Sequence, residues 1–484
     1  MISSPLLPFV DRCLIAGQWV PTTSGDVIAL TNPSDGSELA LIAAGSANDI
    51  DVAQSAAADA LSGAWGKTTA AERGRVLARL GQLVLDNVDE LARLEALDVG
   101  KPLTQARADA VALARYMEFY GGAADKLTGQ TIPYLDGYTV YTLREPHGVT
   151  GHIVPWNYPM QIIGRSVGAA LAAGNAAILK PAEEACLTAL AFGELARQAG
   201  LPEGALNIVP GLGGVAGAAL TAHAGVDHLS FTGSVATGRL VQTAAAHHIV
   251  PVTLELGGKS PQVVFEDADL DAALPFLVGA GIQNAGQTCS ASSRILVHAS
   301  RFDEVVEKMA TRYRGLCAAP ALDDRELGPL VSARQKTIVE GFLEDGKDLE
   351  VAAEGTVAHD APPGGAYVAA RLLIGAAPDH KLAQDEIFGP VQVILPFSDE
   401  DEATAIANGT GYGLVASCWT KDGARQMRMA KKLRAGQVFL NNYGAGGGVE
   451  LPFGGSGLSG HGREKGFEAL YGFTKLKTVA ALHG

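Results

Sequence analysis

Cysteine is scarce in this chain of 484 residues, with only five in all. They stand far apart, at Cys13, Cys186, Cys289, Cys317 and Cys418. An odd number at wide spacing, with no Cys-x-x-Cys pair, argues against a disulfide framework and a structural zinc site. We see no other cluster of metal ligands and expect no metal. Four of the five cysteines are expected to be small buried residues.

Basic residues are also under-represented, because 37 Lys and Arg stand against 52 Asp and Glu, and the formal net charge is −15. No block of Lys or Arg interrupts this acidic background. Phosphate backbones are bound by basic surfaces, so the composition excludes nucleic acid as a partner.

Long apolar runs are missing as well. The most apolar stretch, 162–179, contains Arg165, Gly174 and Asn175. It therefore lacks the roughly 18 uninterrupted apolar residues of a membrane span. The first residues, MISSPLLPFVDR, have neither the basic start nor the apolar segment of a secretory signal. We expect a cytoplasmic protein with no membrane contact.

The chain is rich in alternating strand and helix patterns. Strands are expected at 148–154, 176–180, 206–209, 226–231 and 250–256, with helices at 159–173, 187–199, from about 214 and from 234. This alternation predicts an α/β fold with a parallel, doubly wound sheet, which binds nucleotides beyond the carboxyl ends of its strands. A second α/β region is expected over 260–440, with a helix before Cys289 and strands at 294–298, 391–397 and 437–441.

A β-hairpin is predicted over 127–143, where Asp136 and Gly137 separate two alternating runs. The segment 473–482 has a composition suited to pairing with this hairpin, either in the same chain or in a neighbour.

Three strand ends carry polar residues of interest. PWNYP (155–159) places Asn157 where its amide could face a substrate oxygen, although an Asn there also suits a helix cap. LKPAEE (179–184) offers Lys180 and Glu183 to a ribose, or forms a solvated turn. FTGS (231–234) brings Gly233 and Ser234 to a helix start that suits a pyrophosphate, or forms a plain β–α turn.

A second glycine-rich segment, GLGGVA (211–216), formally matches a dinucleotide-binding pattern. No acidic residue is clearly placed after it, so we interpret it as a structural turn near the adenine side.

Two further segments supply reactive groups. LELGGKSP (254–261) places Glu255 at the end of an apolar strand, where a carboxylate is costly without a function or a partner. GQTCS (286–290) surrounds Cys289 with small residues, so its thiol can be approached closely. A buried structural Cys beside a strand-end Glu is the alternative.

Together these segments resemble the aldehyde dehydrogenase superfamily. VTLELGGKSP (252–261) and NAGQTCS (284–290) match the family's glutamate and cysteine signatures almost letter for letter. PWNYP, LKPAE, FTGS, DEIFGPV (385–391) and PFGG…SGHGREKG (452–466) occur in the family's order and spacing. The resemblance extends from about residue 10 to the end.

The resemblance implies a reaction and its residues. Cys289 would attack the aldehyde, and the Asn157 amide with the Cys289 backbone N–H would hold the oxyanion. Glu255 would activate water to hydrolyse the thioester. A CoA-acylating member would not need Glu255, and a catalytically silent structural relative would have lost one of these three residues.

The resemblance also implies NAD+ as cofactor, with NADP+ possible. Lys180 and Glu183 would hold the adenosine ribose, and Glu183 would disfavour a 2′-phosphate by charge. The other cofactor residues implied are Trp156, Gly233, Ser234, Gly257, Glu386 and Phe388.

The family's fold implies an NAD-binding domain over 1–123 and 144–256 and a catalytic domain over 257–440. A bridging element, over 124–143 and 441–484, would mediate a homodimer or homotetramer.

The aldehyde itself stays open. Tunnel residues are expected in the helix after Asn157, around Cys289 and in the loop 443–453, with Tyr158, Arg165 and Glu450 as substrate candidates. Relatives resembling succinic semialdehyde dehydrogenases carry an arginine at position 165, which grips a carboxylate. The match is partial, because Gln283 and Ser166 depart from that pattern. Alternatively Arg165 pairs with an acid such as Glu450, and the tunnel accepts aromatic or neutral aldehydes.

Overall fold

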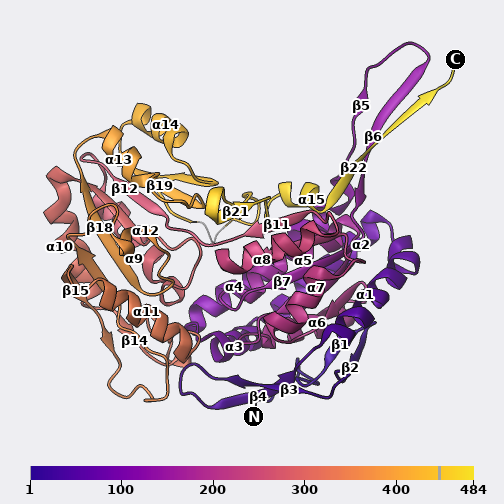
Figure 1. The fold of residues 1–484 in the computed structure, drawn as a ribbon, viewed down its shortest axis with the longest axis horizontal. Helices are drawn as coiled ribbons and strands as arrows, with labels where there is room; N and C mark the ends of the chain where they lie inside the picture. The colour runs from indigo at the N-terminus through magenta and orange to yellow at the C-terminus, as the bar shows by residue number, and fades with distance from the viewer. Residues whose placement is uncertain (1, 445–447) are drawn as a thin grey trace.

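Two large β-sheets organise the chain in the computed structural model, which describes residues 2–444 and 448–484 (Figure 1). The first sheet has the strand order β2 (Gln18–Val20), β1 (Cys13–Ile15), β9 (Leu206–Ile208), β8 (Ala176–Pro181), β7 (Val149–Val154), β10 (His228–Thr232), β11 (Val252–Glu255), β21 (Gly460–His461). The five strands from β9 to β11 are parallel. The predicted α/β fold with a doubly wound sheet is therefore confirmed.

The outer strands of this sheet were not expected from the sequence. β1 and β2 pair antiparallel beyond β9, and β21 pairs antiparallel with β11. They are only two or three residues long, too short for a pattern of alternating hydrophobicity to reveal them.

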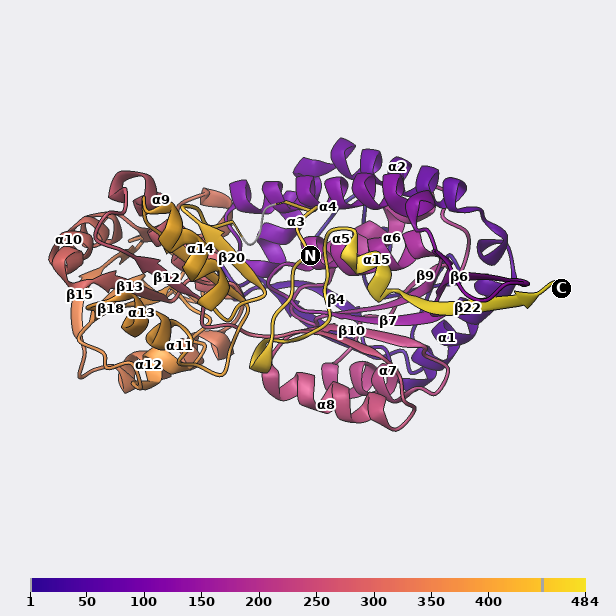
Figure 2. The same ribbon diagram turned by 90° about the horizontal axis from the view of Figure 1, so that it is seen from above.

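Helices cover both faces of the first sheet (Figure 2). One face carries α2 (Ala70–Asp86), α3 (Val88–Val99), α4 (Leu103–Ala123), α5 (Pro159–Ala173) and α6 (Leu187–Gln198). The other carries α1 (Ala47–Ser62), α7 (Ala218–Ala222) and α8 (Val235–Ala246). The glycine-rich segment forms a short π-helical turn, Gly213–Gly217, before α7.

Helix α5 shows how the sequence fixes an element at the site. Pro159 occupies its first turn, and Gly174 ends it in the left-handed conformation at φ 98°. Every residue of the helix is buried and most are apolar, with Gln161, Arg165 and Ser166 as its polar side chains. Its N-terminus is thereby held immediately after Asn157.

The second sheet has the strand order β15 (Glu350–Glu354), β17 (Arg371–Ile374), β18 (Val391–Phe397), β13 (Arg294–His298), β12 (Pro261–Val264), β19 (Val415–Trp419), β20 (Gln437–Leu440). Its helices are α9 (Leu270–Ile282), α10 (Phe302–Tyr313), α11 (Ala333–Asp345), α12 (Lys381–Gln384), α13 (Glu400–Ala407) and α14 (Gly423–Lys432). The two sheets belong to separate hydrophobic cores, so the chain has two main packing units.

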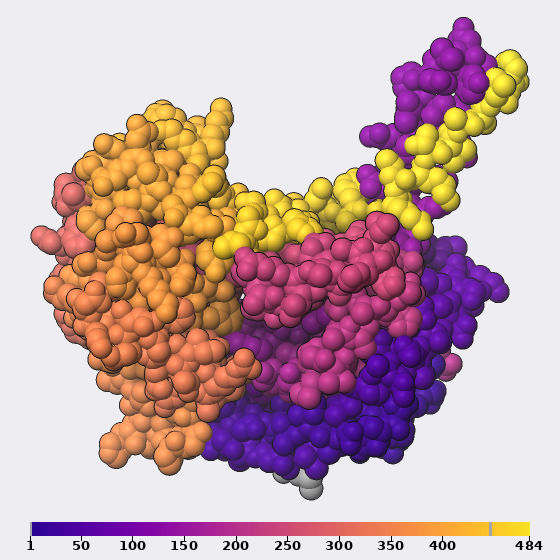
Figure 3. Space-filling model, in the orientation of Figure 1, coloured from indigo at the N-terminus to yellow at the C-terminus, as the bar shows by residue number. Residues whose placement is uncertain are grey.

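A three-stranded arm projects from the first unit (Figure 3). The predicted hairpin is confirmed as β5 (Thr131–Ile132) paired with β6 (Tyr138–Pro146). The C-terminal strand β22 (Thr474–Leu482) pairs with β6 of the same chain along its whole length.

The remaining elements are small. They are the strand pairs β3 (Val27–Thr31) with β4 (Glu38–Ala43) and β14 (Cys317–Ala318) with β16 (Thr356–Val357), and helix α15 (Glu468–Gly472). The range 441–484 therefore divides in the structure: only β22 joins the arm, whereas β21 and α15 pack on the first unit. Over the described residues, no helix is long and apolar enough to cross a membrane.

Candidate active site

The site lies where the order of the parallel strands reverses. From β7 the chain proceeds outward to β8 and β9, then returns to add β10 and β11 on the other side of β7. The carboxyl ends of β7 and β10 therefore leave a crevice between them, the usual ligand site of such sheets. β7 is followed by Pro155–Asn157, and β10 by Gly233 and Ser234.

A cavity of about 450 Å³ begins at this crevice and extends between the two units. It is lined by all eight residues predicted for the cofactor: Trp156, Lys180, Glu183, Gly233, Ser234, Gly257, Glu386 and Phe388. Asn157, Glu255 and Cys289 line it as well. The structure thus brings together residues from segments that are far apart in the sequence.

Lys180 and Glu183 form an ion pair, with Nζ 2.8 Å from Oε2. The other carboxylate oxygen of Glu183 accepts a hydrogen bond from the backbone N–H of Gly213 at 3.4 Å. Burial would raise the pKa of Glu183, but Lys180 overrides it and the pKa is lowered. This carboxylate is therefore ionised in the cavity, and Gly213 shows that the GLGGVA turn lies beside it.

The start of α8 borders the cavity through Ser234 and Thr237. Ser234 is its N-cap, and its hydroxyl accepts a hydrogen bond from the Thr237 N–H at 3.2 Å. A Cβ at Gly233 would lie 2.6 Å from the Phe231 ring, so a side chain there would require the ring to move. A capped helix start beside glycine suits an anionic pyrophosphate.

Glu386 lies against the backbone after β11. Its Oε1 accepts a hydrogen bond from the Gly258 N–H at 2.9 Å, and a Cβ at Gly257 would lie 2.1 Å from its Oε2. Burial raises the pKa of Glu386 to about 7, against the opposing effects of the Gly258 N–H and Lys259. Nearby, Trp156 and Phe388 pack edge to face at 5.3 Å.

Asn157 is tied to the loop that carries Cys289. Its Nδ2 donates to the Gln287 carbonyl at 3.0 Å, and its own carbonyl accepts from Asn284 Nδ2 at 3.1 Å. The N-cap of α5 is Tyr158, with no side-chain cap, so Asn157 does not cap the helix. Asn284 and Ala285 adopt left-handed φ angles of 49° and 53°. Such strain in the loop of the candidate nucleophile is typical of functional sites.

Cys289 is half-buried and lines the cavity. Burial raises its pKa to about 11, and Arg165 is the charge that opposes this shift most. The other cysteines are also free: Cys13, Cys186 and Cys418 are buried, and Cys317 is half-buried. Over the described residues no group of three or more possible ligands could hold a metal ion.

Glu255 is the last residue of β11 and is 1% exposed. Neither carboxylate oxygen has a hydrogen-bond partner among the described residues. Burial, followed by the charge of Glu464, raises its pKa well above the ordinary value. A buried carboxyl group with free oxygens can accept a proton from a bound molecule.

Cys289 also faces a second cavity, which we call the inner cavity. It has about 40 Å³ and is lined by Asn157, Tyr158, Gln161, Ile162, Arg165, Thr232, Gln283, Thr288, Cys289, Ser290, Phe453 and Lys465. Four of these residues, Gln161, Gln283, Thr288 and Ser290, also line a wider recess of about 740 Å³, the vestibule. The shared residues make the vestibule and the inner cavity neighbours, and we interpret them as a route to Cys289 separate from the first cavity, which we call the cofactor cavity.

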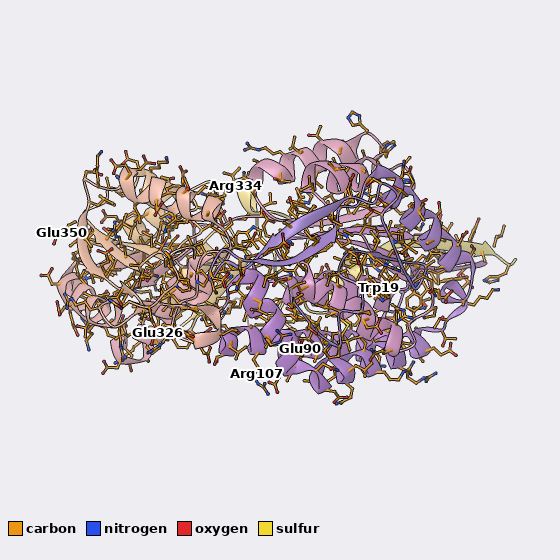
Figure 4. All side chains as sticks on the ribbon, turned by 90° about the horizontal axis from the view of Figure 1, so that it is seen from below. Trp19, Glu90, Arg107, Glu326, Arg334 and Glu350 are labelled. Carbon is orange, nitrogen blue, oxygen red and sulfur yellow. The ribbon has the colours of Figure 1, made fainter. Side chains whose placement is uncertain are left out.

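The two routes open on opposite sides of the chain. Arg334 lines the cofactor cavity and Glu326 the vestibule, and Figure 4 shows them at opposite edges of the junction between the two units. α8 and α11 border the first route, and α4 and α9 border the second.

Sequence reasoning missed Lys465 but included Phe453, at the end of the predicted tunnel loop 443–453. Phe453 and Lys465 line the inner cavity from a loop without helical or strand periodicity. The resemblance to SGHGREKG pointed at this loop but assigned it no role. Tyr443 lies in the predicted tunnel loop and lines the vestibule, whereas residues 445–447 of that loop lie outside the described residues.

Arg165 lines the inner cavity, as expected, but its acidic partner was predicted wrongly. Arg165 pairs with Glu464 and stacks over the Phe453 ring at 4.9 Å. Glu450 instead pairs with Arg115 on α4 at an exposed position and lines neither the inner cavity nor the vestibule. The fold of the loop 453–466 across β11 brings Glu464, rather than Glu450, to α5.

We expect the Arg165–Glu464 pair to matter for stability. Arg165→Leu should lower the free energy of unfolding by about 3–5 kcal/mol, because it leaves a fully buried carboxylate without its cation. Urea denaturation would measure this. The double variant Arg165→Leu/Glu464→Gln should recover a large part of the loss. A single variant as stable as the wild type would contradict the expected coupling.

Comparison with known proteins agrees with the family resemblance seen in the sequence. The model of the family described as "Aldehyde dehydrogenase family" matches residues 19–479. Hydroxyisobutyraldehyde dehydrogenase from Mycolicibacterium austroafricanum is 40% identical over 99% of this chain and 94% of its own length.

Solved structures agree with the fold over the whole chain. A Burkholderia cenocepacia protein assigned as an aldehyde dehydrogenase is 62% identical, with a TM-score of 0.97 over 98% of this chain and 100% of that one. The NAD+ complex of an aldehyde dehydrogenase from Bacillus cereus is 38% identical, with a TM-score of 0.96 over 100% of this chain and 99% of that one.

Proposed function

The chain belongs to the aldehyde dehydrogenase family, and from that premise we propose that it oxidises an aldehyde to a carboxylic acid with NAD+, through a thioester on Cys289. One observation carries the proposal. Cys289, Asn157 and Glu255 line the same cavity as all eight candidate cofactor residues, while Cys289 also faces the inner cavity. The nucleophile thus stands between a nucleotide route and a substrate route.

The residues present fit a dinucleotide. Glu183 and Lys180 would hold the adenosine ribose, and the start of α8 with Gly233 would receive the pyrophosphate. Glu386, with Phe388 and Trp156, would hold the nicotinamide ribose and ring, and Gly257 leaves the space that Glu386 fills. Bound NAD+ would supply the hydride acceptor.

The protein's own residues would perform the remaining chemistry. Cys289 Sγ bonds to the aldehyde carbon as a thiolate, and the oxyanion formed accepts hydrogen bonds from Asn157 Nδ2 and the Cys289 backbone N–H. Turning the Asn157 amide toward an oxyanion requires release of its 3.0 Å bond to the Gln287 carbonyl. After oxidation, Glu255 takes a proton from water, which cleaves the thioester and frees the acid.

Two other functions were weighed. A CoA-acylating enzyme transfers the thioester to a thiol and has no use for a base, yet Glu255 is present with both oxygens available. A silent structural relative does not need Cys289, Asn157 and Glu255 together at one cavity. Formation of NADH with a panel of aliphatic and aromatic aldehydes, without CoA, tests the proposal. No NADH with any of them would overturn it.

We further propose that the arm mediates a homodimer or homotetramer. Several of its apolar side chains are exposed: Ile132, Tyr134, Leu135, Tyr138, Tyr141, Leu143, Leu476 and Leu482. An apolar patch of this kind is typical of an interface.

We also propose that the protein functions in a reducing compartment such as the cytoplasm, because all five cysteines are free.

Cofactor choice gives a separate prediction. The wild type should show a higher kcat/KM with NAD+ than with NADP+, because the ionised Glu183 repels a 2′-phosphate. Glu183→Gln should lower the ratio of kcat/KM with NAD+ to kcat/KM with NADP+ roughly tenfold. Like charges at a partly exposed site repel by on the order of 1–3 kcal/mol, and this substitution removes the repulsion. Initial rates with both cofactors measure the ratio. A wild type that prefers NADP+ would show that Glu183 does not face the ribose.

A further inference from the structure

The passage between the vestibule and the inner cavity is polar. The residues that line both are Gln161, Gln283, Thr288 and Ser290, and we call these four the throat. All four side chains form hydrogen bonds and none is charged. A molecule that comes to Cys289 from the vestibule lies against these groups and displaces the water around them. The throat therefore selects by hydrogen bonding as well as by size.

Gln161 is the throat residue whose orientation is held by a charged partner. It lies on α5, four positions before Arg165, so both side chains share the helix face that lines the inner cavity. Its Nε2 donates a hydrogen bond to Asp109 Oδ1 at 2.5 Å. Asp109 belongs to α4, is buried, and itself lines the vestibule. The Gln161 amide is thus fixed from the neighbouring helix.

Asp109 determines which end of that amide faces it. Its other oxygen, Oδ2, accepts a hydrogen bond from Lys101 Nζ, and the two residues form a buried ion pair. Burial would lower the pKa of Lys101, but Asp109 and Glu95 override it and the pKa is raised. The ammonium group also lies 3.9 Å from the centroid of the Tyr158 ring. Asp109 is therefore held as a carboxylate, which accepts hydrogen bonds and donates none.

The carbonyl end of Gln161 is consequently turned away from α4. Because only the amide nitrogen can donate to Asp109, Oε1 occupies the other branch of the amide plane. Among the described residues, the bond to Asp109 is the only hydrogen bond of the Gln161 side chain. The throat thus contains an acceptor that a buried ion pair holds in place before any molecule binds.

The other three throat residues impose no such direction. Thr288 Oγ1 and Ser290 Oγ lie 3.2 Å apart, and either can be the donor. Hydroxyl groups both donate and accept, so these two can adapt to either kind of ligand group. Gln283 is exposed, so its amide can turn in solvent. Gln161 is therefore the residue that gives the throat a fixed preference.

From this arrangement we propose that Gln161 is a specificity-determining residue, whose Oε1 makes the throat favour neutral aldehydes with a hydroxyl group over aldehydes that carry a methyl group in its place. The proposal rests on the function proposed above, in which the aldehyde reaches Cys289 through the throat. A hydroxyl group donates to the amide oxygen. A methyl group instead leaves that oxygen without a partner and without water, which is the costlier arrangement.

Alkylation of Cys289 tests the throat without any turnover. N-(2-hydroxyethyl)iodoacetamide and N-propyliodoacetamide share one reactive group and differ by a terminal hydroxyl or methyl group, so the abundance of thiolate cancels in the ratio of their rates. Mass spectrometry would follow the Cys289 peptide, with the half-buried Cys317 as internal reference. Gln161→Leu should lower the hydroxyl-to-methyl ratio at Cys289 about tenfold and leave the ratio at Cys317 unchanged.

Gln283→Leu is the matched control. It removes the same amide from the same throat, but from an exposed position with no charged partner to fix it. Its alkylation ratio at Cys289 should stay within about twofold of the wild-type value. The wild type alone supplies a measurement that does not depend on whether a variant folds: the hydroxylated reagent should be favoured several-fold at Cys289 relative to Cys317.

Steady-state kinetics then extends the test to aldehydes. Three pairs differ by a hydroxyl or methyl group at increasing distance from the carbonyl carbon: 3-hydroxy-2,2-dimethylpropanal with 2,2-dimethylbutanal, 3-(hydroxymethyl)benzaldehyde with 3-ethylbenzaldehyde, and 4-(hydroxymethyl)benzaldehyde with 4-ethylbenzaldehyde. In the pair whose hydroxyl group reaches Gln161, Gln161→Leu should lower the hydroxyl-to-methyl ratio of kcat/KM about tenfold. Gln161→Met, which keeps the length of the side chain, should do the same.

The outcomes separate the two proposals. Equal alkylation ratios in the wild type and Gln161→Leu, or an equally large fall in Gln283→Leu, would overturn the role of Gln161. Ratios of kcat/KM that are unchanged by Gln161→Leu in all three aldehyde pairs would do the same. If the wild type oxidises none of the six aldehydes while the alkylation ratios are as expected, the proposed dehydrogenase activity is overturned instead.

Discussion

Cys289→Ser is expected to lower aldehyde oxidation by several orders of magnitude while NAD+ still binds. A serine hydroxyl is a far poorer nucleophile than a thiolate at neutral pH. The side chain is close to isosteric, so the cavity should keep its shape. NADH formation measures the first effect, and quenching of protein fluorescence by NAD+ measures the second.

Cys317→Ser provides the matched control. Cys317 is also free and half-buried, but it lies on β14 in the second unit, away from both cavities. It should retain wild-type kinetics. Near-normal turnover in Cys289→Ser would remove this residue from the mechanism, whatever the control shows.

Glu255→Gln is expected to separate the two halves of the reaction. Acylation should still produce a burst of NADH from the first turnover. Steady-state turnover should fall by about 10²–10⁴-fold, because the amide cannot take a proton from the hydrolytic water. Rapid mixing would resolve the burst, and the thioester should accumulate on Cys289, where mass spectrometry can detect it.

The pH profile sharpens this prediction. Burial raises the pKa of Glu255 well above its ordinary value, and only the deprotonated carboxylate acts as a base. Wild-type deacylation should therefore rise with pH through that raised pKa, and this dependence should be lost in Glu255→Gln. Glu350→Gln, at the far edge of the second unit in Figure 4, is the control. A steady-state rate unchanged in Glu255→Gln would contradict the role.

Much of the site could be anticipated from short segments because of the way parallel sheets are built. Asn157, Lys180, Gly233 and Glu255 each follow or end a strand, and the carboxyl ends of parallel strands lie at one edge. Local signals for strand and helix were enough to place them together. The resemblance to aldehyde dehydrogenase signatures then supplied the chemistry that strand ends alone leave open.

Local patterns gave no information about how residues 453–466 fold against the inner cavity. Phe453, Glu464 and Lys465 lie on a loop that has no periodicity, and the loop crosses the first sheet through the two-residue strand β21. For this reason the acidic partner suggested for Arg165 was wrong: Glu450 lies in the loop 443–453 and Glu464 in the loop 453–466, and only the path of the chain distinguishes them.

The sequence by itself determined the alternation of strands and helices, the candidates for nucleophile and base, and the residues beside the cofactor cavity. Each of these depends on interactions within a short segment or on the common edge of a parallel sheet. The tertiary structure alone decided which charges surround Cys289. The Arg165–Glu464 pair, the position of Lys465 and the Lys101 contact with Tyr158 join distant segments. Side-chain contacts of that kind are set by packing, which no local pattern encodes.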